Sequence, residues 1–176
     1  MENNSITLRK FNENDIENKI RWINDDENNT YLHYDIPLQY DKTLKWYENI
    51  KENENRYDAI IEYNNIPVGV IGLINIDLKN KKAEYYITLG EKKYKGKGIA
   101  TIATKKIIEY GFKNYNIEKI WLCVDAENVI ARKLYEKAGF SLEGILKKDM
   151  YFKNKMIDRC MYGICKEDWS NQEWIY

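Results

Sequence analysis

The sequence predicts a mixed α/β fold built around one central sheet, and three observations predict it. Three segments with alternating apolar residues lie between residues 56 and 89, separated by polar turn signals. A helical pattern then separates the strand at 83–89 from an apolar strand at 120–124, so these two strands are expected to be parallel neighbours. Residues 140–165 have the pattern of a hairpin. The expected sheet has about seven strands, flanked by about four helices.

The N-terminal segment combines one short strand with a helical pattern. Residues 6–8 alternate as a strand, and residues 14–23 carry isoleucines at the spacing of a helix. Asn14 with Glu17 three residues later resembles a capping box, which indicates that the helix starts there. Residues 24–40 are rich in Asn, Asp and Tyr and contain a proline, so we expect no regular element in them.

An antiparallel meander follows a second helix. Asp41 is placed to cap this helix, whose apolar residues continue to residue 50. Strands are expected at 56–63, 66–76 and 83–89, with polar turns between them. Consecutive strands joined by tight turns pair antiparallel, so these three form the meander.

The second half of the chain alternates strands with helices and ends on two strands. Residues 99–110 carry the apolar stripe of one helix, and residues 128–138 carry that of another. The continuous apolar run at 120–124 is typical of a strand buried on both faces. Two further strands are expected at 140–152 and 156–165, around a Lys-Asn-Lys turn.

The composition is that of one folded domain. The chain has 176 residues, 44% hydrophobic and 14% aromatic, which fits a single domain over 1–176 with its own core. Its 28 basic and 28 acidic residues balance, which argues against nucleic acid as a partner. The N-terminus is polar and no apolar run is long enough to span a membrane, so we expect a cytoplasmic protein with no membrane partner.

Metal-binding and thiol chemistry are weakly represented. Cys123, Cys160 and Cys165 have no short spacing motif, so neither a disulfide framework nor a zinc site is expected. We expect Cys160 and Cys165 to be buried thiols. His33 is the single histidine, which argues against His-based metal sites and Ser-His-Asp triads. We therefore predict no metal cofactor.

A glycine-rich loop at residues 94–101 is the strongest local signal. It contains Lys-Gly-Lys-Gly, follows a predicted strand and opens a predicted helix. Glycine permits unusual φ values and close approach of a ligand, and a helix start offers unpaired N–H donors with a positive dipole end. These properties predict a phosphate or pyrophosphate site. A Walker loop pattern is absent, and Thr101 stands where a dinucleotide fingerprint needs Gly or Ala.

Two segments together resemble a known superfamily. Residues 94–100 resemble the acyl-CoA pyrophosphate loop of the GCN5-related N-acetyltransferase (GNAT) superfamily, and residues 128–140 resemble its second signature. The resemblance covers most of residues 2–169 and is strongest to the branch of ribosomal-protein, polyamine and amino-sugar N-acetyltransferases. Lys93 departs from the loop pattern, in which Gln or Arg is frequent at this position. Lysine keeps the positive charge of Arg but lacks its planar, forked guanidinium group.

The resemblance implies a reaction. Acetyl-CoA is the expected co-substrate, and the acetyl group moves to a primary amine of a small molecule, a polyamine or an amino sugar, by direct attack on the thioester. A protein N-terminus, as in the ribosomal-protein enzymes, is an alternative acceptor. A non-catalytic module that binds or senses acyl-CoA is an alternative of another class. Self-association into a homo-oligomer is left open.

The resemblance also implies which residues hold acetyl-CoA. In the family, backbone N–H groups of the loop hold the pyrophosphate, and the preceding strand pairs with the pantetheine arm. The expected cofactor-binding residues are Tyr86, Ile87, Thr88, Leu89, Lys95, Gly96, Lys97, Gly98, Ile99, Ala100, Thr101, Asn128, Ala131 and Lys133. Asn128 equally fits the N-cap of the helix that follows it.

Two residues are the expected catalytic groups. Tyr135 matches the general acid of the family, which protonates the leaving thiolate, although a core tyrosine would suit the same helix stripe. Glu84 is the candidate for a base acting through water or for an anchor of the substrate ammonium, and it would also suit an ordinary sheet surface. A base is needed because a primary amine with a pKa near ~10 is mostly protonated at neutral pH.

The acceptor pocket is expected on the N-terminal helices and the segment between them. The substrate-binding residues implied by the resemblance are Arg21, Trp22, Tyr31, His33, Tyr34 and Glu84. Aromatic side chains there suit stacking on a sugar, a base or an alkyl amine. Trp22 equally suits a place in the core.

Overall fold

A computed structural model describes residues 5–171 of the chain. It contains one seven-stranded sheet with the order β1-β2-β3-β4-β5-β7-β6. All neighbours are antiparallel except β4 and β5, which are parallel. The strands are β1 (Ile6–Lys10), β2 (Tyr57–Tyr63), β3 (Ile66–Asp77), β4 (Lys82–Leu89), β5 (Lys119–Asp125), β6 (Ser141–Phe152) and β7 (Lys155–Cys165). This confirms the predicted meander, parallel pair and hairpin. Residues 1–4 and 172–176 of the expected domain lie outside the described residues.

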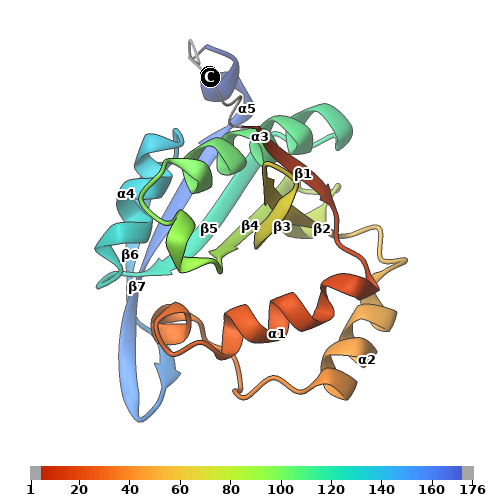
Figure 1. The fold of residues 1–176 in the computed structure, drawn as a ribbon. Helices are drawn as coiled ribbons and strands as arrows, with labels where there is room; N and C mark the ends of the chain where they lie inside the picture. The colour runs from red at the N-terminus through yellow and green to blue at the C-terminus, as the bar shows by residue number, and fades with distance from the viewer. Residues whose placement is uncertain (1–4, 172–176) are drawn as a thin grey trace.

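Helices cover both faces of the sheet. Figure 1 shows α1 and α2 on one side and α3 and α4 on the other. The α-helices are α1 (Ile16–Asn24), α2 (Tyr40–Ile50), α3 (Ile99–Asn114), α4 (Val129–Lys137) and the short α5 (Lys166–Ser170). Single turns of 3-10 helix lie at η1 (Glu13–Asp15), η2 (Asn28–Tyr31) and η3 (Lys92–Tyr94). None of the helices in the described part of the chain is long and apolar enough to cross a membrane.

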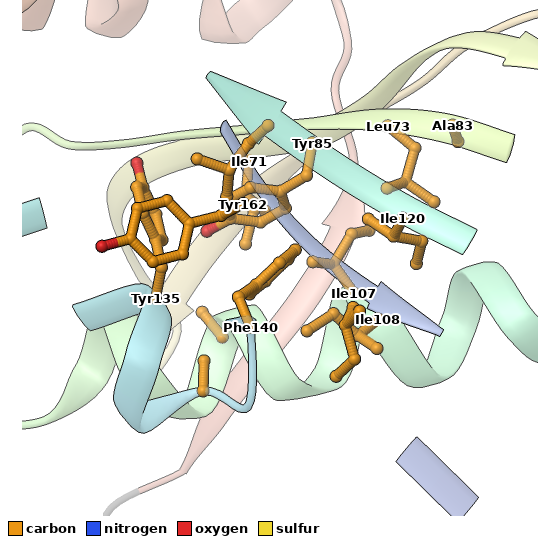
Figure 2. Packing of buried hydrophobic residues seen from close by; sticks show 14 of the residues in the cluster. Ile71, Leu73, Ala83, Tyr85, Ile107, Ile108, Ile120, Tyr135, Phe140 and Tyr162 are labelled. Carbon is orange, nitrogen blue, oxygen red and sulfur yellow. The ribbon is translucent and has the colours of Figure 1, made fainter. Parts of the chain in front are cut away.

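The larger core lies between the sheet and the α3–α4 layer. Ile107 and Ile108 of α3 pack against Ile120 of β5, and Phe140 follows α4 into the same cluster (Figure 2). The smaller core lies under α1 and α2, where Ile16 and Trp22 are buried. The 3.6-residue and two-residue periods of the sequence therefore produce two apolar layers, one on each face of the sheet.

Two predictions for the N-terminal segment need correction. The capping box is formed by Asn12 and Asp15 instead of Asn14 and Glu17, and it opens the 3-10 turn η1 at Glu13, which α1 follows at Ile16. The carboxylate of Asp15 accepts the Asn12 N–H at 2.9 Å and is also held by Arg9, which fixes it in this position. The segment 24–40 contains the short helix η2, and the Asp25 carboxylate accepts the N–H groups of Glu27 and Asn28 at its start.

The start of α2 and the expected burial also differ. Gln39 is the N-cap of α2, and Asp41 lies inside its first turn, where a carboxylate still favours the positive end of the helix dipole. Cys160 is buried as predicted, but Cys165 is exposed because β7 ends there. Alternate residues of β5, such as Cys123, are only partly buried, because one face of this strand borders a cleft.

Lys19 is an unusual member of the layer under α1. It is 5% exposed, its ammonium lies 4.5 Å from the centre of the Trp46 ring, and burial lowers its pKa to about 8. In the unfolded chain the pKa is near 10.5, so below pH 8 the lysine is charged in both states and the folded state carries the full cost of the buried charge. Stability is therefore expected to rise as the pH increases from about 8 to 10.5.

Lys19→Met is predicted to stabilise the protein near neutral pH. Removal of the buried charge contributes about 3 kcal/mol, and loss of the cation–π contact offsets about 1 kcal/mol of that gain. Urea unfolding, monitored by circular dichroism at neutral pH and again above the pKa of free lysine, measures the gain in the free energy of unfolding at each pH. The gain is expected to shrink at the higher pH. A variant that is less stable than the wild type at neutral pH would contradict this assignment.

Candidate active site

The parallel strands β4 and β5 separate after three residue pairs. Lys82, Ala83 and Glu84 pair with β5, and no later residue of β4 does. Beyond Glu84, β4 stays bonded to β3 up to Leu89, and β5 stays bonded to β7 up to Asp125. The facing edges of the two strands therefore present backbone N–H and C=O groups to the gap between them, which is a template for an extended ligand.

A cleft of about 810 Å³ occupies this gap. The ends of β4 and β5, the glycine loop, the start of α4 and the segment from Glu27 to His33 line it. The expected cofactor-binding residues line it with one exception, namely Tyr86, Ile87, Thr88, Leu89, Lys95, Gly96, Gly98, Ile99, Ala100, Thr101, Asn128, Ala131 and Lys133. The exception is Lys97, whose ammonium lies over the ring of Tyr94.

The glycine loop has the backbone geometry of an anion cradle. Gly96 and Gly98 have φ values of 75° and 78°, which other residues adopt only with strain. Within residues 5–171, the N–H groups of Gly96, Lys97 and Gly98 have no backbone acceptor. The first turn of α3 adds further N–H groups that the helix itself leaves unpaired. These donors converge where an anion would meet the positive end of α3.

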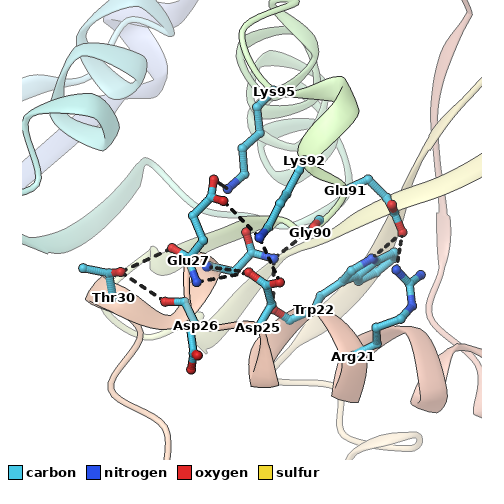
Figure 3. Close-up of polar contacts among 11 residues, drawn as sticks. Arg21, Trp22, Asp25, Asp26, Glu27, Thr30, Gly90, Glu91, Lys92 and Lys95 are labelled. Carbon is cyan, nitrogen blue, oxygen red and sulfur yellow. Dashed lines mark hydrogen bonds and ion pairs between the residues drawn. The ribbon is translucent and has the colours of Figure 1, made fainter.

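Ion pairs and a hydrogen bond connect the glycine loop and the residues just before it to the segment that follows α1. Glu27 pairs with Lys92 at 3.0 Å and with Lys95 at 3.3 Å, and Asp25 also pairs with Lys92 (Figure 3). These lysines lower the pKa of Glu27 through hydrogen bonds and charge. Asn28 donates to the Gly90 carbonyl at 2.9 Å, which ties the segment to the end of β4. Lys92 and Lys95 are thus already held by carboxylates, and the backbone donors offer the main capacity for an anion.

Asn128 caps α4 and faces the cleft. Its Oδ1 accepts the Ala131 N–H at 3.1 Å, so the N-cap interpretation is confirmed. The cap uses only the amide oxygen. The amide NH₂ group can therefore serve a ligand in the cleft at the same time.

Tyr135 lies in the wall of the cleft between aromatic rings. It is 8% exposed, and its ring packs edge-on against Tyr85 at 5.8 Å and near Phe140 at 6.1 Å (Figure 2). Burial raises the pKa of Tyr135 above its usual value, because a phenolate would be desolvated there. The hydroxyl therefore keeps its proton at neutral pH and can donate it or a hydrogen bond.

Glu84 lies on the opposite face of the sheet from Tyr135. Tyr85 points toward α3, where its hydroxyl meets Thr104 at 2.8 Å, so its neighbours Glu84 and Tyr86 point toward the α1–α2 side. Asn75 donates to the Glu84 carboxylate at 2.7 Å from a bulge in β3. The gap between β4 and β5 separates Glu84 from Tyr135, so a ligand in the gap would meet one group from each side.

His33, an expected substrate-binding residue, pairs with Asp125 at the end of β5, and this pairing was not predicted from the sequence. His33 Nε2 lies 3.1 Å from Asp125 Oδ2, and both residues line the cleft. Asp125 is 7% exposed, and Arg159 lies beside this end of the cleft with its own partner Asp149. The available signal was strand alternation, which places Asp125 on the same face as Cys123.

The residues predicted to bind the acceptor do not all line the same cavity. Tyr31, His33 and Glu84 line the cleft, whereas Arg21 and Trp22 do not. Trp22 is 1% exposed in the core under α1, and its indole N–H donates to Glu91, which fits the core alternative given for it. Arg21 binds Glu91 on the outer side at 2.7 Å. Tyr34 lines a second, separate pocket.

Comparisons with known proteins agree with this geometry. The model of the acetyltransferase (GNAT) domain matches residues 5–141. A spermidine N(1)-acetyltransferase of Escherichia coli is 29% identical to this chain, and the match covers 84% of this chain and 78% of the relative. A putative ribosomal N-acetyltransferase of Bacillus subtilis is 31% identical, and the match covers 68% of this chain and 64% of the relative. A crystal structure of spermidine N-acetyltransferase from Vibrio cholerae in complex with CoA and spermine superposes with a TM-score of 0.87 at 25% identity, covering 94% of this chain and 98% of that one.

The cap of α4 yields a prediction about stability. Asn128→Ala is expected to destabilise the protein by about 1 kcal/mol, because the Ala131 N–H loses its acceptor. Asn128→Ser supplies a hydroxyl acceptor and is the matched control, expected to restore most of the loss. Chemical denaturation of the three proteins measures the difference. Equal stability of the alanine variant and the wild type would show that the cap contributes nothing.

Proposed function

Because the chain belongs to the GNAT acetyltransferase family, an acetyl-CoA-dependent group of N-acetyltransferases, we propose that its acceptor is the primary amine of a small molecule, a polyamine or an amino sugar. We further propose that residues 1–176 form one domain and that Tyr135 and Glu84 carry the chemistry. The observation that supports the site is the separation of β4 and β5 beyond Glu84, with the glycine loop at one end of the gap.

The residues present fit acetyl-CoA. The unpaired edges of β4 and β5 suit the amide-bearing pantetheine arm, which can pair with a strand edge. The loop N–H groups from Gly96 to Thr101 suit the pyrophosphate. Asn128 offers a free amide NH₂ between these two positions. Acetyl-CoA, when bound, supplies the activated acetyl group as a thioester.

Glu84 serves the incoming amine. A primary amine with a pKa near ~10 arrives as an ammonium and must lose a proton before it can attack. The Glu84 carboxylate either holds this ammonium or accepts its proton through a water molecule, and the Asn75 amide keeps the carboxylate in place. The amine then approaches from the α1–α2 side of the gap.

Tyr135 serves the departing sulfur. Attack on the carbonyl carbon forms the C–N bond and breaks the C–S bond, and the thiolate must then be protonated. Tyr135 lines the cleft and carries its proton at neutral pH, so its hydroxyl can donate to the sulfur from the α4 side as the C–S bond breaks. The nitrogen gives up its remaining extra proton in the same step, which replaces the proton delivered to the sulfur. No covalent enzyme intermediate is needed. The pKa of the Cys123 thiol is raised by burial, which makes this residue a poor nucleophile.

The relatives support a small amine without fixing which one. Both the Escherichia coli relative and the Vibrio cholerae structure are spermidine acetyltransferases. The Bacillus subtilis relative is a putative ribosomal N-acetyltransferase and keeps a protein N-terminus as a second candidate acceptor. A non-catalytic acyl-CoA sensor would need the cleft but neither Glu84 nor Tyr135.

We predict turnover with acetyl-CoA and small primary amines. Thiol release is measured with a chromogenic disulfide against a panel of polyamines, amino sugars and an N-terminal peptide of a ribosomal protein. At least one small amine is expected to exceed the peptide in kcat/KM. Binding of acetyl-CoA without turnover on any amine would support the sensor instead, and preference for the peptide would support the protein acetyltransferase.

Tyr135→Phe is predicted to lower kcat by about 100-fold, since general-acid catalysis is worth roughly that factor or more. The ring stays in its aromatic surroundings, so acetyl-CoA affinity and the unfolding midpoint are expected to change little. Tyr63→Phe is the matched control outside the cleft. Unchanged kcat in the Tyr135 variant would remove it from the reaction.

A further inference from the structure

A second pocket of about 290 Å³ lies between the α1–α2 layer and the sheet. Its walls include Tyr34, Trp46 and Tyr86, and its charged residues are Lys19 and Arg56, with Lys42 at the exposed rim. Among the described residues that line it, none is a carboxylate. The pocket is therefore an aromatic chamber whose lining carries positive charge.

The Lys19 ammonium faces this pocket without an anionic partner. Among residues 5–171 it has no hydrogen bond or ion pair, and its contacts are with the rings of Trp46 at 4.5 Å and Tyr34 at 5.4 Å. The nearest carboxylate, Asp58, is occupied elsewhere. Arg56 binds it at 2.6 and 2.8 Å, and the Tyr86 hydroxyl donates to it at 2.5 Å.

An unpaired buried cation that lines a cavity indicates a ligand. Buried charges in proteins are normally paired, because desolvation of an ammonium costs several kcal/mol. Trp46 and Tyr34 offset only part of that cost. An anionic group that enters the pocket from outside would supply the partner that Lys19 lacks among residues 5–171.

The pocket adjoins the acceptor side of the cleft. Tyr86 lines both cavities, and it points to the same face of the sheet as Glu84. Glu84 and Tyr86 are two residues apart on β4, a separation of about 7 Å along the strand. One small molecule can therefore place an amine near Glu84 and a second group beyond Tyr86.

We propose that this pocket holds the anionic group, a carboxylate or a phosphate, of the acceptor amine, with Lys19 as its counter-charge. This inference rests on the proposed function. It selects a substrate class, since an amine that carries an anion, such as a phosphorylated or nucleotide-linked amino sugar, fits both ends. A polyamine would bring a second ammonium toward the unpaired Lys19, which repels it.

Matched pairs of amines test this selection. Glucosamine 6-phosphate is compared with glucosamine, and 4-aminobutyrate with butylamine, by kcat/KM in the thiol-release assay. We expect the anionic member of at least one pair to be preferred about tenfold or more, since hydrogen bonds to a charged group are worth that much. The pair that shows the preference tells a phosphate site from a carboxylate site.

Lys19→Met is expected to reduce that preference to less than about threefold, because the counter-charge is lost. Loss of folding does not explain such a result, since this variant is predicted to be more stable than the wild type. Lys79→Met, on the exposed turn between β3 and β4, is the matched control and keeps the wild-type ratio. A ratio unchanged by Lys19→Met would overturn the proposal, as would spermidine turned over faster than every anionic amine.

A binding measurement separates failure of this inference from failure of the proposed function. Calorimetry compares glucose 6-phosphate and 4-acetamidobutyrate, which cannot accept an acetyl group on an amine, with glucose. We expect one of the two anions to bind the wild type and to bind Lys19→Met at least about tenfold more weakly. Anion binding without turnover of any amine would refute the proposed activity on a small amine and support the anion site at Lys19. Turnover without anion binding would refute the anion site and leave the proposed activity intact.

Discussion

The structure depends on one constraint, the loss of pairing between β4 and β5 after Glu84. Each strand survives this loss because its other edge is fully bonded, β4 to β3 and β5 to β7. Gly69 of β3 permits part of that support, since a Cβ there would lie 2.4 Å from the Thr88 carbonyl oxygen. The gap is thus built into the sheet, and a ligand in it can be reached from both faces of the sheet.

The two ends of this gap differ in the charge that they offer to a ligand. At the loop end, Asp25 and Glu27 already balance Lys92 and Lys95, so the backbone offers the main donors for an anion. At the acceptor end, Glu84 offers negative charge, and Lys19 beyond Tyr86 offers positive charge. Burial lowers the pKa of Lys19, and its ammonium faces a cavity in which an anion would offset the cost of burying the charge.

The sequence predicted the features that depend on local signals. Gly96 and Gly98 were expected because a loop between strand and helix suits positive φ. Asn128 and Tyr135 were expected because residues 128–140 resemble a family signature, which spans α4 and its N-cap. Contacts between distant residues were not predicted. The sequence does not show that His33 meets Asp125 across 92 positions, and it left two places open for Trp22, which faces the core because α1 packs on β3. Lys19 gave no signal, since a lysine on an amphipathic helix normally faces water.

Hydrogen–deuterium exchange with and without acetyl-CoA, read at single residues, tests most directly whether the gap and the loop form one binding site. Added acetyl-CoA is expected to slow exchange of the loop amides from Gly96 to Thr101 and of those β4 and β5 amides beyond Glu84 that face the gap. Amides of β1 and β2 are expected to keep their rates. Binding of acetyl-CoA that protects neither the loop nor the facing strand edges would contradict the account.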